Sequence, residues 1–182
     1  MEENRGRRAM LCFPQMATKA QITAEQYLHM TFEYDAEYVH GEIVERALPD
    51  LNHSRTQARV CFQLEDLHSL FRLLPCIGVR MKLAEGLFRV ADVAVFSSRP
   101  IEDYPEQPPL VVVEIVSPDD RHHYLMEKLE EYRVWGVANI WVVDPLSKRL
   151  FIYTESGLQN ASSLALADYP FELTPAILFS DL

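Results

Sequence analysis

Apolar residues recur at helical spacing in three stretches of the chain. A short helix is expected to begin at Thr23, because Thr23 can cap it and Gln26 stands at the position of a capping-box partner. Residues 53–74 have the period of a long amphipathic helix, with inward positions at Val60, Leu64, Leu67 and Phe71. A third helix follows the capping residues of Ser117-Pro118-Asp119-Asp120, with inward positions at Leu125, Leu129 and Tyr132 and an end at Gly136.

Between these helices the sequence has the alternation and apolar runs of β-strands. Residues 36–46 (AEYVHGEIVER) predict a hairpin that turns near His40-Gly41, and residues 49–52 predict a loop. Residues 110–116 form the most apolar run, which is typical of a central strand covered on both faces. The other predicted strands are 77–84, 89–97, 139–144 and 149–154, of which the last two form a closing hairpin through residues 145–148.

The order of these elements is helix, hairpin, helix, three strands, helix and two strands. It predicts an α/β (α+β) domain in which helices pack on a mixed central sheet. No internal repeat or Gly/Ser linker divides the chain, so residues 17–182 are expected to form a single domain. Residues 1–16 are expected to be a disordered extension, and whether Met1 or Met16 is the natural start stays open.

Composition narrows the class of protein but not its function. The chain has 182 residues and is 48% hydrophobic, which is enough for a substantial core, and no run approaches the roughly 18 to 20 apolar residues of a membrane span. Cys12, Cys61 and Cys76 have no paired or metal-knuckle spacing, which fits a reducing cytoplasm. The net charge of −10 argues against nonspecific coating of nucleic acid. A nuclease remains open, because clustered acids that hold a cation add to this negative total.

Two acids interrupt apolar strands, and they are the first candidates for chemistry. Glu114 lies inside LVVVEIVS and Asp92 inside RVADVAVF, 22 residues earlier. A buried carboxylate is costly without a partner, a proton or a metal. If the two strands are neighbours, both carboxylates can lie on one face and share a divalent cation. Oxygen ligands of this kind suit Mg²⁺ or Mn²⁺ rather than zinc.

Lys128 is the third candidate, because backbone geometry places it level with Glu114. From Glu114 to Pro118 a strand advances about 13 Å at roughly 3.3 Å per residue. From Asp120 to Lys128 a helix advances about 12 Å at roughly 1.5 Å per residue. A helix that folds back along the strand therefore brings the Lys128 ammonium to Glu114, where it could stabilise developing charge or orient a water.

The chain resembles the Uma-two endonuclease family, a branch of the PD-(D/E)XK restriction-endonuclease-like superfamily. The resemblance covers nearly everything after Met16 and rests on a combination of motifs rather than on any one of them. These are ITAEQYL, AEYVHGEIVE, the helix at His53, RVADVAVF, LVVVEIVSP, EKLEEYRVWGVANIWVVDP and FELTPAILFSDL. The implied fold is a restriction-endonuclease-like core.

The resemblance also implies roles for individual residues. Asp92 matches the acid of the "PD" element, Glu114 the acid of the (D/E)XK element, and Lys128 a lysine that has migrated to the following helix. Glu37 matches an acid that helps to complete the metal site, and His53 a recurring histidine at the helix start.

Three positions depart from the family pattern. Ala91 replaces the proline of "PD", and Val116 stands at the usual lysine position. Tyr124 stands where family members often carry an aspartate, which weakens any argument from a second acid on the helix.

Plainer interpretations exist for most of these side chains. Asp92 could be a strand-end acid satisfied by backbone amides, Glu37 an exposed hairpin acid and His53 an ordinary helix-start residue. Lys128 could be a solvated lysine paired with Glu127 or Glu131. Other candidates are read as structural: a solvated turn at His122-His123, a solvated face at Glu130-Glu131, and core or interface aromatics at Trp135 and Trp141.

Two functional hypotheses follow. The first is a Mg²⁺- or Mn²⁺-dependent endonuclease acting on DNA, in which Asp92, Glu114, Glu37 and the Ile115 carbonyl hold the cation and Lys128 assists. The second is a non-catalytic scaffold or interaction domain with the nuclease architecture, favoured by the overall acidity and Tyr124. For the first, DNA contact is expected from a basic rim of Arg55, Arg59, Arg80, Lys82 and Arg121. A homodimer is expected to form through an edge strand offered by the closing hairpin.

Overall fold

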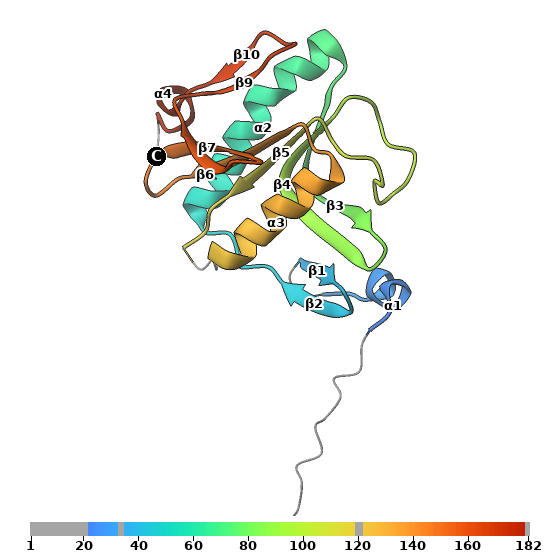
Figure 1. Ribbon diagram of the computed structural model, residues 1–182. Helices are drawn as coiled ribbons and strands as arrows, with labels where there is room; N and C mark the ends of the chain where they lie inside the picture. Colours follow the sequence, from blue (N-terminus) through green and yellow to red (C-terminus); the bar gives the residue numbers. More distant parts are fainter. Residues whose placement is uncertain (1–21, 33–34, 119–121, 181–182) are drawn as a thin grey trace, which may run out of the picture.

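A mixed sheet of eight strands forms the centre of the protein (Figure 1). The structure is a computed structural model that describes residues 22–32, 35–118 and 122–180. The strands follow one another as β2, β1, β4, β5, β6, β7 and β8, and β3 also pairs with β4. Their bounds are β1 Ala36–Val39, β2 Glu42–Glu45, β3 Leu74–Ala84, β4 Leu87–Phe96, β5 Val111–Ile115, β6 Asn139–Asp144, β7 Arg149–Thr154 and β8 Gly157–Ala161.

Strand β5 occupies the middle of this sheet, as its unbroken apolar run predicts. It runs antiparallel to β4, with Val93 opposite Val113, and parallel to β6, with Glu114 opposite Val142. All five of its residues are buried. Strand β4 is buried along its whole length as well, so an ionisable side chain on either strand must find its partners inside the protein.

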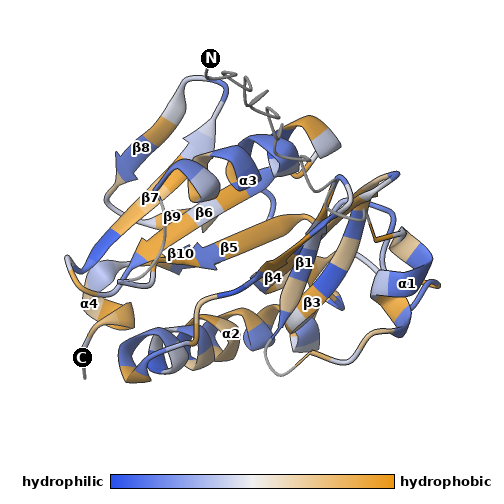
Figure 2. Ribbon diagram, turned by 90° about the horizontal axis from the view of Figure 1, so that it is seen from below, coloured by the Kyte–Doolittle hydropathy of each residue, from blue (hydrophilic) through white to orange (hydrophobic). Residues whose placement is uncertain are grey.

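Helices cover both faces of the sheet (Figure 2). On one face α2 (Leu51–Phe71) packs through Val60, Leu64 and Leu67 together with the small sheet of β9 (Leu164–Leu166) and β10 (Phe171–Leu173) and with α4 (Pro175–Leu178). On the other face α3 (His122–Trp135) packs through Leu129 and Tyr132. This layering confirms the predicted mixed sheet with flanking helices.

The N-terminal elements anchor the hairpin that carries Glu37. Helix α1 (Ala24–His29) has the predicted capping box between Thr23 and Gln26. Its buried Tyr27 stacks on Tyr38 of β1, and the Tyr27 hydroxyl donates to the Ala36 carbonyl at 2.6 Å. Because these contacts fix β1 at the start of β4, the hairpin is held over the site described below.

Several details differ from the expectations. Helix α2 begins at Leu51, capped by Asp50, rather than at His53 after a loop over 49–52. Phe71 is 40% exposed because the helix ends there and Arg72 takes a left-handed φ of 62°. The closing hairpin offers no edge, since β8 pairs with β7 and is itself the last strand.

Some predictions lie outside the described residues. They are the extension over residues 1–16 with its two possible starts, and the capping role of Asp119 and Asp120. In the part of the chain that the structure describes, none of the helices is both long and apolar enough to cross a membrane.

Candidate active site

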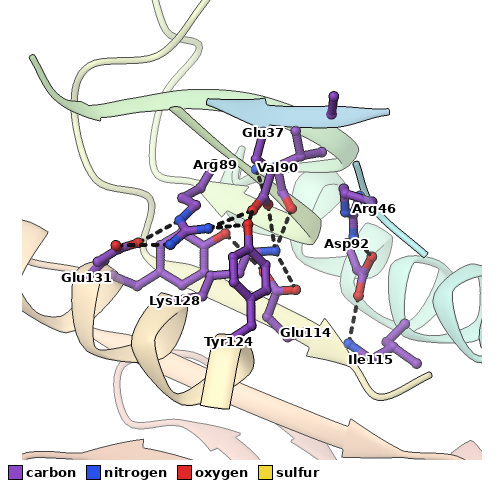
Figure 3. Close-up of polar contacts among 12 residues, drawn as sticks. Glu37, Arg46, Arg89, Val90, Asp92, Glu114, Ile115, Tyr124, Lys128 and Glu131 are labelled. Carbon is purple, nitrogen blue, oxygen red and sulfur yellow. Dashed lines mark hydrogen bonds and ion pairs between the residues drawn. The ribbon is translucent and has the colours of Figure 1, made fainter. Parts of the chain in front are cut away.

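Asp92 and Glu114 come together across neighbouring strands, which meets the condition under which their carboxylates can lie on one face. Continuing the antiparallel register of β4 and β5 by one residue sets Asp92 opposite Glu114. The backbone N–H of Ile115 donates to Asp92 Oδ2 at 2.7 Å. Both side chains line a cavity of about 650 Å³, and Figure 3 shows them on the same side of the sheet.

Lys128 reaches this pair from α3, at the height that the rise of strand and helix predicts. Its ammonium lies 2.9 Å from Glu114 Oε2, 2.9 Å from Glu37 Oε1 and 2.9 Å from the Val90 carbonyl (Figure 3). The side chain is buried, so the interpretation as a solvated lysine paired with Glu127 or Glu131 is wrong. Three acceptors surround one ammonium, which fixes its position and keeps it charged.

Glu114 has an unusual proton affinity for a glutamate. Burial raises the pKa of its carboxyl to about 7, and the charge of Asp92 adds to the rise, while Lys128 opposes it. Lys128 does not cancel the effect of burial because it shares its charge with Glu37. The Tyr132 hydroxyl donates to Glu114 Oε1 at 2.9 Å, so both carboxylate oxygens have a donor.

Glu37 is fully buried, which rules out an exposed hairpin acid. It accepts from the Val90 N–H at 2.9 Å, from Arg89 at 2.9 Å and from the Tyr124 hydroxyl. Although burial acts to raise its pKa, Lys128, Arg89 and these hydrogen bonds hold the pKa down at about 2. Glu37 therefore carries a fixed negative charge beside Lys128.

Arg89 completes this arrangement and was not among the predicted site residues. Its guanidinium forks onto Glu131 at 2.6 and 2.9 Å, binds Glu37, and lies 4.7 Å from the ring centre of Tyr124. Glu131 was expected to lie on a solvated face. It is instead the partner of a buried arginine. We call Glu37, Arg89, Tyr124, Lys128 and Glu131 the inner network.

Asp92 has a different set of neighbours from the inner network. Arg46 Nη2 lies 2.5 Å from its Oδ1, and His53 Nε2 lies 3.3 Å from its Oδ2. Burial would raise the pKa of Asp92, but His53, Arg46 and the more distant Lys128 bring it well below its usual range. Asp92 is therefore no strand-end acid held by backbone amides alone, and we call Arg46, His53 and Asp92 the outer contact.

The side chains of the site include oxygen donors for the predicted divalent cation. In the described ranges no three His, Cys, Asp or Glu side chains are grouped closely enough to hold a metal ion by themselves. Two carboxylates, Asp92 and Glu114, line the cavity beside Ile115, whose main-chain carbonyl was predicted to be the third donor. An oxygen-only set of this kind fits Mg²⁺ or Mn²⁺. The contacts of Glu37 place it against Lys128 and Arg89, and its ligand role stays a prediction.

The predicted basic rim is not a single surface. Arg80 packs over the rings of Tyr27 and Tyr104, and Lys82 pairs with Glu106. Arg59 binds the Ile177 carbonyl and Ser180 beside α4. Neither these residues nor Arg55 lines the cavity, and Arg121 lies outside the described residues. The cations that do line the cavity are Arg46 and Lys128.

The remaining candidates have ordinary places. His122 and His123 are exposed in the first turn of α3, although His123 lines the cavity mouth. Trp141 is buried in the core, where it stacks on Phe171, and Trp135 packs at the edge of the α3 core. Both tryptophans are thus core aromatics, as expected.

Comparison with known proteins identifies the family and the fold of the chain. A family model described as Uma2, putative restriction endonuclease, matches residues 24–175. The chain is also similar to the crystal structure of a putative nuclease belonging to DUF820 from Anabaena variabilis ATCC 29413, with a TM-score of 0.79 at 20% identity. The match covers 87% of this chain and 98% of that one. No match was found among curated proteins. The predicted restriction-endonuclease-like fold is confirmed.

Proposed function

Because the chain belongs to the Uma2 family of putative restriction endonucleases, we propose that it is a Mg²⁺- or Mn²⁺-dependent endonuclease that hydrolyses phosphodiester bonds of DNA. The observation that carries this proposal is the position of Lys128. Its buried ammonium contacts Glu114 and Glu37, beside Asp92, on the wall of an open cavity. Ionisable groups that are buried among opposite charges beside a cavity are typical of functional sites, and packing of a core does not require them.

Each residue has a distinct proposed role. Asp92 and Glu114, with the Ile115 carbonyl, hold the cation, and Glu37 either completes this set or orients Lys128. A bound Mg²⁺ supplies Lewis-acid polarisation of the phosphate and a water of lowered pKa. Lys128 contributes positive charge where negative charge develops on the phosphate and can position the attacking water by hydrogen bonding. His53 helps to orient Asp92.

The inner network supports these roles by fixing Lys128. Catalysis by a charged group depends on its being held in place before the reaction, so that no reorganisation is needed in the transition state. Glu37 binds Lys128, and Arg89 and Tyr124 in turn bind Glu37. The network therefore gives the ammonium one position without taking it out of reach of the cavity.

Cleavage of supercoiled plasmid in Mg²⁺, Mn²⁺ or EDTA tests the proposal. We expect metal-dependent nicking that falls at least about 100-fold in Asp92→Asn and in Glu114→Gln, because each removes a metal ligand. Asp103→Asn and Glu102→Gln, which change exposed acids in the loop before β5, are matched controls and should cleave like the wild type. Cleavage that persists in EDTA, or that survives both site substitutions, would overturn the proposal.

The alternative is a non-catalytic scaffold with the nuclease fold. It is favoured by the engagement of Asp92 Oδ1 with Arg46 and by Tyr124 in place of a second helix acid. Folded protein that binds DNA or a protein partner but cleaves neither DNA nor RNA oligonucleotides in Mg²⁺ or Mn²⁺ would support this alternative. The same assay, run with single- and double-stranded substrates, tests the DNA preference.

A homodimer also remains a proposal. Within the described sheet the strand order ends in β2 on one side and in β8 on the other, and either edge strand could pair with a second copy. Sedimentation velocity across a range of protein concentrations distinguishes a monomer from a dimer. We also propose a cytoplasmic location, because the three cysteines of the sequence have no paired or metal-knuckle spacing.

A further inference from the structure

Arg46 is a cation that forms an ion pair with Asp92, a predicted metal ligand. It follows β2, and its backbone N–H is fixed to the Asp35 carbonyl at 2.9 Å, while its side chain enters the cavity. The guanidinium binds Asp92 Oδ1 at 2.5 Å, and Figure 3 shows the Arg46 and Asp92 side chains next to each other. The side chain keeps 20% of its surface exposed.

The oxygen that Arg46 occupies is the one a divalent cation would need. Asp92 Oδ2 already accepts from the Ile115 N–H at 2.7 Å and lies 3.3 Å from His53. Oδ1 is therefore the oxygen left for a ligand on the cavity side. A guanidinium and a divalent cation are both positively charged. They therefore repel each other strongly at the short distance that sharing one carboxylate oxygen would impose.

Arg46 is held much more loosely than the other arginine of the site. Within the described residues Asp92 is the only side chain to which Arg46 bonds, whereas Arg89 is fully enclosed by Glu37, Glu131 and Tyr124. A long side chain with one anchor and an exposed flank can rotate into the cavity without unfolding its surroundings. Arginine also matches the geometry of phosphate oxygens, to which its planar fork can bind bidentately.

We propose that Arg46 is a displaceable internal cation. In the metal-free protein it neutralises Asp92, and a divalent cation takes its place on Oδ1. The released guanidinium then binds a phosphate of the nucleic acid in the same cavity. The competition for Asp92 concerns metal binding alone, and the phosphate step rests on the proposed function.

Binding of Mn²⁺, followed by electron paramagnetic resonance of the free ion, tests the competition in the full chain. Arg46→Met keeps the apolar stem and removes the charge, and we expect it to bind Mn²⁺ about tenfold more tightly than the wild type. Arg46→Gln keeps a hydrogen-bond donor without the charge and should shift affinity in the same direction, which preserves the test if the methionine variant does not fold. Arg133→Met, which breaks an exposed pair with Glu130, is the matched control and should leave the affinity unchanged.

Binding of a DNA oligonucleotide in Ca²⁺ tests the second step, with fluorescence anisotropy as the readout and a gel to confirm that the DNA stays intact. Here Arg46→Met should bind about tenfold more weakly than the wild type. Opposite signs for metal and DNA are the signature of displacement, because a merely structural role for Arg46 would weaken both.

The outcomes separate this inference from the proposed function. Unchanged or weaker Mn²⁺ binding in both Arg46 variants overturns the inference, even if the wild type cleaves DNA in an Asp92-dependent way. Tighter Mn²⁺ binding in a protein that never cleaves supports the competition and overturns the endonuclease proposal. Tighter Mn²⁺ binding with unchanged DNA affinity overturns the phosphate step. Failure of every variant and of the wild type to bind Mn²⁺ overturns both proposals.

Discussion

Two arginines bind carboxylates at the same site and are held in opposite ways. Arg89 is 0% exposed and contacts two glutamates and a tyrosine, so it belongs to the rigid inner network. Arg46 keeps 20% of its side chain exposed and holds one oxygen of Asp92 in the outer contact. The comparison teaches that one half of the site is closed by its own charges, while the other half can exchange its partner for a ligand.

This difference follows from the energetics of buried charge. A buried ion pair is stable only when every remaining donor and acceptor is satisfied, and removal of one partner then costs far more than the pair contributes. The inner network meets this condition with protein groups alone. The outer contact borders the cavity, where water or a cation can substitute for Arg46.

The largest effect on the free energy of unfolding is therefore expected from replacement of Arg89. Arg89→Met leaves Glu37 and Glu131 without their shared partner in the interior, and we expect the free energy of unfolding to fall by about 3 to 5 kcal/mol. Urea denaturation monitored by tryptophan fluorescence measures the change. Arg133→Met, at an exposed pair on the same helix as Glu131, should show no resolvable loss. A smaller loss for Arg89→Met than for Arg46→Met would reverse the comparison.

The second effect concerns Glu114, which lies between the two halves and has a pKa of about 7. Its folded pKa exceeds that of an unfolded glutamate, so the folded state binds the proton more tightly. The resulting stability is complete below about pH 4.5 and is lost as the pH rises through 7. In EDTA we expect the free energy of unfolding to fall by about 2 to 3 kcal/mol between pH 5 and pH 8.

Glu114→Gln should flatten this dependence, because glutamine does not titrate. The carboxylates of Glu37 and Asp92 do not confuse the measurement, since their lowered pKa values place their own contributions below about pH 4.5. Urea denaturation at four or five pH values for both proteins provides the comparison. A wild-type profile that is flat, or a variant profile with the same slope, would show that Glu114 is ionised throughout this range.

The outcome of the sequence predictions has a physical pattern. Lys128 could be placed level with Glu114 because the rise per residue of a strand and a helix is nearly constant, and the structure has the two side chains 2.9 Å apart. That the strands of Asp92 and Glu114 are neighbours was only a condition of the metal-site hypothesis, and the structure meets this condition.

The partners of the two arginines could not be predicted in this way. Arg89 stands 42 residues from Glu131, and Arg46 stands 46 residues from Asp92. The carboxylate with which each arginine pairs depends on how the hairpin and α3 lie over the sheet. Local periodicity in the sequence does not report this arrangement. One signal was available for Arg89: like Asp92, it interrupts the apolar run LFRVADVAVF. The same limit explains Phe71, whose helical position is inward but which is the last residue of its helix, stays 40% exposed and contacts the ring of Tyr169 edge-on.

A smaller effect is expected at Tyr124, which replaces the aspartate expected on this helix. Tyr124→Phe removes a hydroxyl that donates to Glu37 and accepts from Arg89, and should cost about 1.5 to 3 kcal/mol because the acceptor is charged. Double-mutant cycles measured by urea denaturation sharpen the comparison. Tyr124→Phe should couple strongly to Arg89→Met and add to Arg46→Met within about 0.5 kcal/mol. Equal coupling to both arginines would mean that the two halves are one network.

The smallest expected effect is on the stability of the metal-free protein when Arg46 is replaced. Arg46→Met should lower the free energy of unfolding by about 1 to 2 kcal/mol, which is less than the usual cost of breaking a buried pair. The reason is that Asp92 keeps the Ile115 N–H and its contact with His53, and its free oxygen faces a cavity that water can enter. Addition of Mn²⁺ should return this stability to the variant, because the cation then supplies the charge that Arg46 supplied. The same Mn²⁺ concentration should raise the unfolding midpoint of Arg46→Met by more than that of the wild type, in which part of the binding energy is spent on displacing the guanidinium.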